Sequence, residues 1–590
     1  MSRSPLPASV RRSARTRGSA ALVVSLVLAG GLAACGPDDN GSASSGAAKG
    51  GGAGASGAPQ RGGTLTVLNA QPTTDFDPAR LYTSGGGNVP SLVFRTLTTR
   101  ARENGAAGSK VVPDLATDTG TPSKNATVWT YHLKKGLTYE DGSPITSADI
   151  KYGIERSFAG ELSGGAPYLR DWLIGGAGYQ GPYKDKSGKG LASIETPDDA
   201  TIVFHLNKPE GEFPFLATQT QFAPVPKKKD TGTKYENHPV SSGPYKVVSN
   251  ENDGERIILA RNTHWSADND DQRKAYPDRI DVRSGLDSAV INQRLSASVG
   301  KDAAAITTDT NLGPAELAKV TGDKKLASRV GTGHFGYTNY LAFNPKVKPF
   351  DNPKVREAVA YAVNRASVVN AAGGSALAEP ATTFLPDQKS FGYTKYDPFP
   401  AGDSGNPRKA KELLKEAGHA KGLTITLYHN NAKNFATSPE VATALQDALA
   451  KAGIKVRLKG LDSSDYSDTV YSVKTQPGAF LAGWGADWPS GGPFLGPVFD
   501  GRQIVKDGYN FNSGRLNDPA VNKEIDEINK VTDLDAAAAR WGALDKKIGE
   551  QALTVPLFHP VYKRLVGTAV KNVVISDWTG VLDISQVAVK

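Results

Sequence analysis

The sequence predicts an α/β protein with several domains, and three observations support this. The chain has 590 residues, which is more than a single hydrophobic core usually serves. Its hydrophobic content of 38% is ordinary for a globular protein. Strand-like and helix-like segments alternate between residues 407 and 548, and this alternation favours a mainly parallel sheet.

The first half of the chain begins with strand signals. Alternating residues from Thr64 to Leu68 predict a strand, and turn-forming residues follow it directly. A second strand is expected at 128–133. Thr146 and Asp149 then form the signature of a helix cap, and apolar residues three to four positions apart continue from Ile150.

The second half gives the clearest alternation. Asn352 and Pro353 open a helix whose apolar residues recur with a 3.6-residue period. The other expected elements are a helix at 407–417, a strand at 423–427, a helix at 439–450, a strand at 454–458, a strand at Phe480, and helices at 518–528 and 534–548.

Residues 1–34 have the features of an export signal. Five arginines and no acidic residue precede an apolar stretch, Ala20 to Leu32, which is too short to span a bilayer comfortably. Cys35 follows two alanines and resembles the cysteine of a bacterial lipobox, which implies cleavage before Cys35 and lipid attachment to it. The alternative is a chance cysteine behind a conventionally cleaved signal. Arg11 and Arg12 leave the twin-arginine route open.

Composition excludes several classes of function. The five arginines of the signal account for more than half of the formal net charge of +9, so the rest of the chain lacks the charge of a nucleic-acid-binding protein. Cys35 is the only cysteine, which rules out internal disulfides, cysteine-based zinc sites and iron–sulfur clusters. Residues 35–60 are rich in Gly, Ala and Ser and predict a flexible tether.

The motifs of catalysis are missing. No Gly-x-Ser-x-Gly elbow occurs, and the eight histidines lack metal-ligand spacing; His132 and His559 are interpreted as structural. Gly331-x-Gly333-x-x-Gly336 fits a dinucleotide-binding pattern, but a strand and not a helix is expected after it, so we reject that interpretation. We therefore expect no enzyme, no cofactor and no metal.

The stretch Phe480 to Pro489 is the most informative in the chain. An apolar run leads into Trp484 and Trp488, and the carboxylate of Asp487 lies between them. A charge at the end of an apolar run is costly unless a partner compensates it. Two interpretations stay open from these residues alone: a capping aspartate beside core tryptophans, or a ligand pocket with aromatic walls and one fixed charge.

Several motifs resemble one family. They are the strand–turn–helix segment 128–150 with its Asp141-Gly142 turn, Ser242-Gly243-Pro244-Tyr245, the Arg261-Asn262 pair with Trp265, and the segment from Tyr340 to Arg365. In this order they resemble the family 5 extracellular solute-binding proteins of ABC importers, the bacterial peptide and nickel class, and in particular its oligopeptide- and dipeptide-binding lipoproteins. The resemblance covers roughly residues 62–590.

The resemblance implies a two-lobed, periplasmic-binding-protein-like fold (type II, large peptide-binding class) with an extra subdomain inserted in lobe I. Ligand would be enclosed between the lobes, with hinges near residues 331 and 559. The implied divisions are a signal peptide at 1–34, a tether at 35–60, lobe I at 61–82 with 238–330 and 560–590, the inserted subdomain at 83–237, and lobe II at 331–559.

The resemblance also implies a binding site. Gly483-Trp484-Gly485-Ala486-Asp487 matches a family motif in which the aspartate pairs with a peptide's terminal ammonium. Trp484, Gly485 and Trp488 would then belong to the pocket, and Asn69, Gln71 and Tyr82 are candidate wall residues from lobe I. Arg502, Lys506 and Arg515 follow the motif, but each is interpreted as a solvated loop charge rather than the partner of the peptide's carboxylate.

The implied function is a receptor that delivers peptides to an ABC transporter permease and ATPase. The protein would be a monomer on the outer face of the bacterial cell membrane, held there by its lipid anchor, with no nucleic acid partner. The alternatives are the same fold with another solute (a nickel chelate, haem, an oligosaccharide or an opine-like compound), a signalling lipoprotein that no longer transports, and an extracellular hydrolase, which would need a nucleophile or metal site that the sequence lacks.

Overall fold

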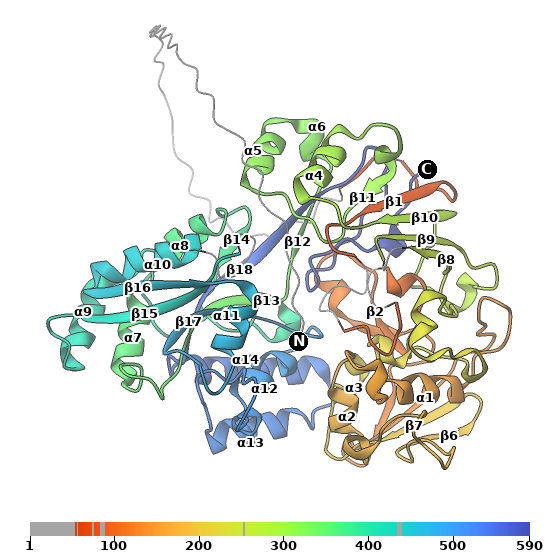
Figure 1. Ribbon diagram of the computed structural model, residues 1–590, viewed down its shortest axis with the longest axis horizontal. Coiled ribbons are helices and arrows are strands. Elements are labelled where there is room, and N and C mark those ends of the chain that lie inside the picture. Colours follow the sequence, from red (N-terminus) through yellow and green to blue (C-terminus); the bar gives the residue numbers. More distant parts are fainter. Residues whose placement is uncertain (1–52, 56, 73–75, 83–88, 252–253, 433–438) are drawn as a thin grey trace, which may run out of the picture. The chain divides into compact units, whose positions relative to one another are not determined.

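The computed structural model describes residues 53–590, except 56, 73–75, 83–88, 252–253 and 433–438. Cys35 and most of the predicted tether therefore lie outside the described residues. Within these ranges the strands form four sheets, and helices pack against them (Figure 1). No helix of the described part is both long and apolar enough to cross a membrane.

A five-stranded sheet contains the predicted first strand. Its order is β11-β1-β10-β9-β8. β1 is parallel to β10 and β11, whereas β9 is antiparallel to β8 and β10. The bounds are β1 Thr64–Leu68, β8 Tyr245–Glu251, β9 Arg256–Arg261, β10 Arg279–Arg283 and β11 Ala305–Ile306.

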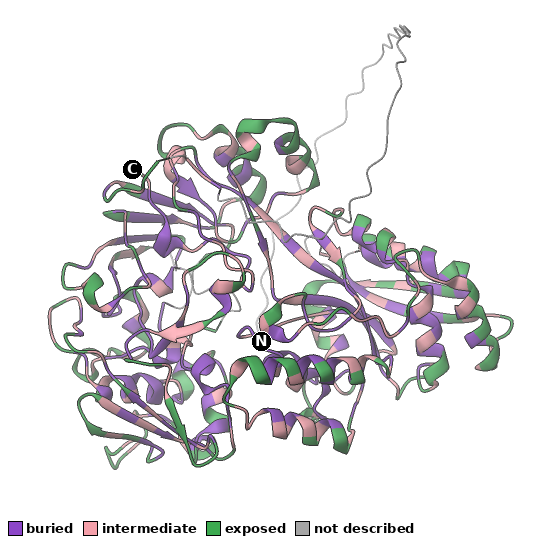
Figure 2. Ribbon diagram, turned by 180° about the vertical axis from the view of Figure 1, so that it is seen from behind, coloured by how far each residue is buried: buried purple, intermediate pink, exposed green. Residues whose placement is uncertain are grey.

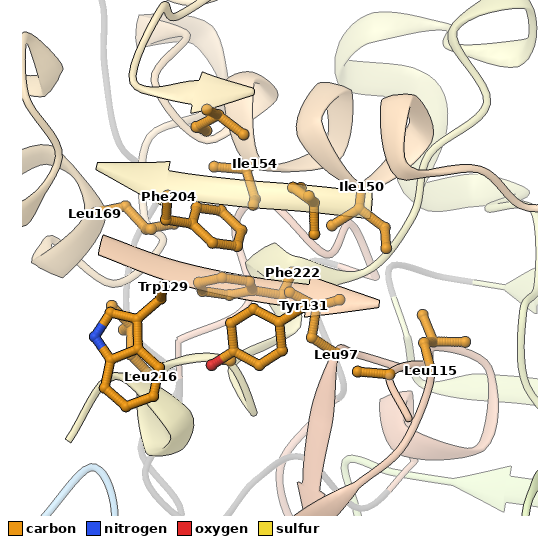
Figure 3. Packing of buried hydrophobic residues seen from close by; sticks show 14 of the residues in the cluster. Leu97, Leu115, Trp129, Tyr131, Ile150, Ile154, Leu169, Phe204, Leu216 and Phe222 are labelled. Atoms are coloured by element: carbon orange, nitrogen blue, oxygen red, sulfur yellow. The ribbon is translucent and has the colours of Figure 1, made fainter. Parts of the chain in front are cut away.

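A four-stranded antiparallel sheet, β4-β5-β7-β6, lies within the predicted inserted subdomain. The helix expected after Thr146 is present as α1, and the Thr146 and Asp149 side chains form the predicted capping box. Figure 3 shows Ile150 and Ile154 of α1 in one buried cluster with the aromatic side chains of β5 and β7. The bounds are β4 Thr121–Ser123, β5 Val128–His132, β6 Ile194–Asp198 and β7 Thr201–His205, with a separate pair formed by β2 Thr98–Arg100 and β3 Val111–Pro113.

Buried ion pairs join this segment to connections of predicted lobe I, at Asp77 after β1 and at Arg273 before β10. The Arg156 guanidinium at the end of α1 donates to both carboxylate oxygens of Asp77, at 2.8 and 2.7 Å. The carboxylate of Asp114 likewise accepts from Arg95 and Arg273 at 2.8 Å each. Removing one partner of such a pair would leave an uncompensated buried charge, so these contacts hold the two parts in a fixed register.

The largest sheet has seven strands in the order β12-β18-β13-β17-β15-β16, with β14 beside β18. The prediction of a mainly parallel sheet is wrong for this sheet, because only β15 with β16 and β15 with β17 are parallel and the other pairs are antiparallel. The helix-linked segment 407–485 gives the parallel strands, whereas β12, β13 and β18 arrive from distant parts of the chain. The bounds are β12 Val330–His334, β13 Tyr337–Phe343, β14 Ala378–Pro380, β15 Leu423–Asn430, β16 Ile454–Leu461, β17 Ala479–Gly485 and β18 Thr554–Leu565.

The strands β12 and β18 contain the two predicted hinge positions, 331 and 559. They run side by side, and β18 also pairs with β13 through its first half (Figure 1). The strand β13 follows β12 after two residues, so a strand follows Gly331-x-Gly333-x-x-Gly336, as predicted. The hinge role of these strands and the lobe boundaries stay predictions.

The helices that the sequence predicts are all present, with bounds close to those expected. The Asn352 side chain caps α7 as predicted, accepting from the backbone N–H of Lys354 at 3.0 Å. In Figure 2 the strands are largely buried, whereas the helices are exposed along one side. The bounds are α1 Ser147–Arg156, α2 Tyr168–Trp172, α3 Phe213–Leu216, α4 Ser288–Ala297, α5 Pro314–Gly322, α6 Lys324–Ala327, α7 Pro353–Ala362, α8 Arg365–Ala371, α9 Pro407–Glu416, α10 Pro439–Lys451, α11 Ser463–Val470, α12 Gly492–Phe499, α13 Pro519–Ile528 and α14 Leu534–Gly549.

Candidate ligand-binding site

The candidate site begins where β17 ends. Gly485 is the last residue of this strand, and Asp487 lies in the short connection before α12. The backbone N–H of Ala486 still donates to the Gly336 carbonyl of the neighbouring chain segment at 3.3 Å. This bond fixes the connection, so the position of the Asp487 side chain is set by the sheet.

Two tyrosine hydroxyls hold the Asp487 carboxylate. The Tyr82 hydroxyl donates to Oδ2 at 2.9 Å, and the Tyr168 hydroxyl donates to the same oxygen. Gln219 Nε2 donates to the backbone carbonyl of Asp487 at 3.4 Å. Among the described residues, Oδ1 accepts no hydrogen bond and no cationic side chain lies within ion-pair distance of Asp487. One carboxylate oxygen is therefore left for another donor.

The electrostatics of this carboxylate favour a cationic guest. Burial raises the pKa of Asp487, and the two tyrosine hydrogen bonds lower it by less. Burial and the charge of Asp487 also raise the pKa of Tyr82 and of Tyr168, so both hydroxyls remain protonated donors at neutral pH. A cation beside Oδ1 would stabilise the charged carboxylate, which neutral hydroxyls compensate only in part.

Aromatic rings surround this carboxylate on one side. The Tyr168 ring packs on Trp488 with centroids 4.8 Å apart and on Trp172 at 5.6 Å. Trp488 is 2% exposed, and its indole Nε1 donates to Glu212 Oε2 at 2.6 Å. Trp488 therefore supports the Tyr168 ring and is itself held by Glu212.

Among the described residues, Glu212 is a second carboxylate with no cation within ion-pair distance. It is 5% exposed and accepts from Trp488, from the Ser490 hydroxyl, and from Trp541 Nε1 at 2.9 Å. Burial raises the pKa of Glu212, and these three hydrogen bonds oppose that rise. Glu212 belongs to the predicted inserted subdomain and its donors to predicted lobe II, so this network joins the two.

The other predicted pocket residues of β17 and its connection take separate positions. Trp484 is half-buried, donates through Nε1 to the Pro493 carbonyl at 2.9 Å, and packs on Phe511 at 5.1 Å. Gly485 faces Tyr337, whose Cδ2 would lie 2.8 Å from an added Cβ. Glycine is thus needed there for packing.

Of the three wall candidates from predicted lobe I, only Tyr82 is brought to Asp487 by a hydrogen bond. Asn69 is buried, and its Oδ1 accepts from the backbone and hydroxyl of Thr308 at 3.1 Å each. Gln71 is exposed, and its backbone N–H donates to Asp309 at 2.8 Å. No hydrogen bond given by the described residues links Asn69 or Gln71 to Asp487.

The cations that follow the motif lie elsewhere. Arg502 pairs with Asp500 and Asp526 at 2.7 Å each. Arg515 donates to Gln476 at 2.9 Å, and Lys506 is exposed. In the described ranges, no group of three or more His, Cys, Asp or Glu side chains is placed to hold a metal.

Sequence reasoning missed Tyr168, Gln219 and Glu212. Tyr168 lies in the five-residue helix α2, which is too short to show a periodic pattern. Glu212 offered a usable signal, because it is an acid directly before the apolar run Phe213 to Leu216. That is the same pattern, a charge beside an apolar run, that singled out Asp487.

Curated relatives share most of their length with this chain. Di/tripeptide-binding protein 1 of Pseudomonas aeruginosa (strain UCBPP-PA14) is 26% identical over 514 residues, which cover 82% of this chain and 86% of the relative. The glutathione-binding protein GsiB of Salmonella choleraesuis (strain SC-B67) is 26% identical over 462 residues, covering 77% of this chain and 81% of the relative.

Solved structures share the fold. The clavulanic acid biosynthesis oligopeptide binding protein 2 superposes with a TM-score of 0.83 at 33% identity, covering 92% of this chain and 99% of the other. The unliganded open form of the periplasmic murein tripeptide binding protein MppA gives 0.72 at 22% identity, covering 91% and 98%, which supports the fold alone. The two-lobed α/β fold implied by the resemblance is confirmed.

Residues 110–505, about two thirds of the chain, match the family described as "Bacterial extracellular solute-binding proteins, family 5 Middle". This protein belongs to the family 5 bacterial extracellular solute-binding proteins.

Proposed function

We propose that this protein captures short peptides through their free amino terminus and delivers them to an ABC importer. The observation that carries the proposal is the Asp487 carboxylate, which is largely buried, held by two neutral hydroxyls and left with Oδ1 unbonded among the described residues. A peptide's terminal ammonium brings a positive charge and three donors, so it matches what this oxygen lacks. The peptide-binding relatives support the same class of ligand.

Closure of the lobes around the peptide is supported by the hydrogen bonds of Tyr82 and Tyr168 to Asp487, because the three residues belong to different predicted parts of the chain. Tyr82 belongs to predicted lobe I, Tyr168 to the inserted subdomain and Asp487 to predicted lobe II. These contacts form together only when the lobes are near one another, so a ligand that uses Asp487 favours the closed population. Membership of a family of solute-binding proteins supports binding without turnover.

The remaining features of the proposal concern location. Cys35 would carry the lipid anchor, and residues 35–60 would give the binding unit freedom to reach the permease from the membrane surface. The protein would act as a monomer, and the permease and ATPase would supply the energy for transport.

Calorimetry with trialanine and N-acetyl-trialanine tests the ammonium role. We expect Asp487→Asn to weaken binding of trialanine at least tenfold, because the substitution keeps the shape and removes the charge that pairs with the ammonium. Binding of the acetylated peptide, which carries no ammonium, should change far less.

Tyr82→Phe is the matched control. It removes one hydroxyl from Oδ2 and keeps the charge of Asp487, so its effect on trialanine should be smaller than that of Asp487→Asn. Equal losses for trialanine and N-acetyl-trialanine in Asp487→Asn would remove the ammonium from the proposal.

A further inference from the structure

A polar cavity of about 100 Å³ lies beside the strand β2. Its walls come from β2, from the segment that contains Thr218 and Thr220, and from the loop 574–583 near the carboxyl terminus. This volume has room for several waters or one small polar group. Hydroxyl groups are the commonest polar groups of its lining, and they include those of Thr96, Thr99, Thr218, Thr220, Ser576 and Thr579.

These hydroxyls offer few free donors. Thr96, Thr218 and Thr220 donate to backbone carbonyls, at 2.6, 2.8 and 3.1 Å. Ser576 and Thr579 bond to one another at 2.9 Å. The cavity therefore takes most of its donor capacity from its arginines.

Arg100 is the one lining arginine that the described residues leave without an anion. Arg102 pairs with Asp583 at 2.9 Å, and Arg273 pairs with Asp114 at 2.8 Å. The Arg100 guanidinium instead lies over the Trp578 ring, 4.1 Å from its centroid, and makes no hydrogen bond or ion pair within the described part of the chain. Glu103 also lines the cavity, but its side chain is exposed.

The electrostatic environment agrees with an uncompensated cation. Burial, and secondly the charge of Arg102, lower the pKa of Arg100 to about 9. The charge of Asp583 opposes this fall and is the smallest of the three effects. A guanidinium on an aromatic face keeps its planar fork of donors free for an anion.

The cavity adjoins the surroundings of Asp487. Thr218 and Thr220 flank Gln219, which donates to the Asp487 carbonyl. Thr220 also donates to the carbonyl of Leu81, the neighbour of Tyr82. An extended peptide advances about 3.3–3.6 Å per residue, so a short peptide with its ammonium at Asp487 reaches this wall within a few residues.

We propose that Arg100 binds a carboxylate of the captured ligand in this cavity, and this inference rests on the proposed capture of peptides. Arg100 would hold the two carboxylate oxygens with parallel N–H donors. The group has two sources in a peptide, the terminal carboxylate and an acidic side chain. Together, Asp487 and Arg100 would recognise opposite charges on one ligand.

Calorimetry with wild type and Arg100→Gln on three probes tests the inference. The probes are trialanine, trialanine amide and Ala-Glu-Ala amide. If Arg100 binds the terminal carboxylate, Arg100→Gln weakens trialanine at least tenfold and leaves both amides unchanged. If it binds an acidic side chain, only Ala-Glu-Ala amide is weakened.

Lys110→Gln is the control for net charge, because it removes an exposed cation next to β3 and outside the cavity; it should bind all three probes as wild type does. Arg100→Lys keeps the charge and loses the planar fork, so we expect an intermediate loss, and it carries the test if Arg100→Gln fails to fold. Wild-type affinities in both Arg100 variants would overturn the inference and leave the peptide function standing. A folded wild type that binds none of the probes would overturn the peptide function, and this inference with it.

Discussion

At the scale of single residues, Asp487, Glu212 and Asp545 show the same unusual environment. Each is at least partly buried, each accepts hydrogen bonds from neutral donors, and no cation of the described residues is within ion-pair distance of any of them. Asp77 and Asp114, by contrast, are neutralised by arginines. Neutral donors lower the pKa of a buried carboxylate less than a cation does, so these three charges remain costly and sensitive to their surroundings.

Asp545 makes this sensitivity measurable as a dependence of stability on pH. It is 4% exposed, and burial raises its pKa to about 7, although the backbone N–H groups of Phe384 and Leu385 donate to it. The unfolded chain releases this proton near pH 3.9, so the folded state holds more protons between about pH 4 and 7. The free energy of unfolding should therefore fall as the pH rises through this window, by about 4 kcal/mol from this group.

Urea unfolding of wild type and Asp545→Asn between pH 4.5 and 8 measures this contribution. In Asp545→Asn the free energy of unfolding should fall less as the pH rises, because asparagine does not titrate. This difference in slope is expected whatever the stability of the variant at low pH. Asp535→Asn on the exposed side of α14 is the control and should keep the wild-type slope. Parallel curves for wild type and Asp545→Asn would contradict a raised pKa.

At the scale of elements, local sequence patterns predicted the helices and strands well, but they did not predict contacts between residues far apart in the sequence. The cap of α1, the start of α7 and the strands β1 and β17 all follow from signals within a few residues. Asp487 was found in the same way, from a charge beside an apolar run. Its partner Tyr168 is 319 positions away, and no periodicity of either segment encodes that contact.

The sheet order shows the same limit. The alternation of helices and strands in 407–485 predicts parallel neighbouring strands, and β15 is parallel to β16 and β17. The strand β18, however, pairs antiparallel with β12, β13 and β14, which are distant from it in the sequence. Such pairings depend on where a returning strand finds an open edge, which a single sequence does not specify.

The glycines of β12 show why the dinucleotide-like pattern occurs in a strand. An added Cβ at Gly333 would lie 2.5 Å from the Gly580 backbone, which has little freedom to move. An added Cβ at Gly331 would lie 2.6 Å from Ile575 Cδ1, the end of a flexible side chain. Close packing of the loop 574–583 on β12 therefore explains the spacing without a nucleotide.

Gly333→Ala and Gly331→Ala form a matched pair that tests this. We expect Gly333→Ala to lower the free energy of unfolding by about 1–3 kcal/mol, as overpacking against rigid atoms does. Gly331→Ala should cost less, because the Ile575 side chain can change rotamer. Urea denaturation of both variants gives the comparison, and a larger loss for Gly331→Ala would show that the loop moves more easily than Ile575 does.

At the scale of the whole molecule, Glu212 is the contact that best reports on closure. The carboxylate accepts from Trp488, Ser490 and Trp541, so the predicted inserted subdomain is joined to predicted lobe II directly behind Asp487. A ligand shifts a population only through contacts that differ between the open and closed states. If the Glu212 network forms on closure, it sets part of the free energy against which a peptide binds.

Glu212→Gln should therefore lower the affinity for trialanine without removing any ligand contact. Glutamine presents one acceptor oxygen and one NH2 group, so at least one indole N–H of Trp488 or Trp541 would face a donor. Such an unsatisfied buried group costs about 1–3 kcal/mol. This cost exceeds the gain from removing the Glu212 charge, because three donors already stabilise that charge. The cost would apply to the closed state alone. We expect a fivefold or greater rise in Kd, and small-angle scattering should show a larger radius of gyration than wild type at the same trialanine concentration.

Glu210→Gln is the control, since Glu210 is equally buried two residues earlier but pairs with Lys208 of its own segment at 2.9 Å. A Glu212→Gln protein that binds trialanine normally and only unfolds more easily would instead place this network in an interface that never opens.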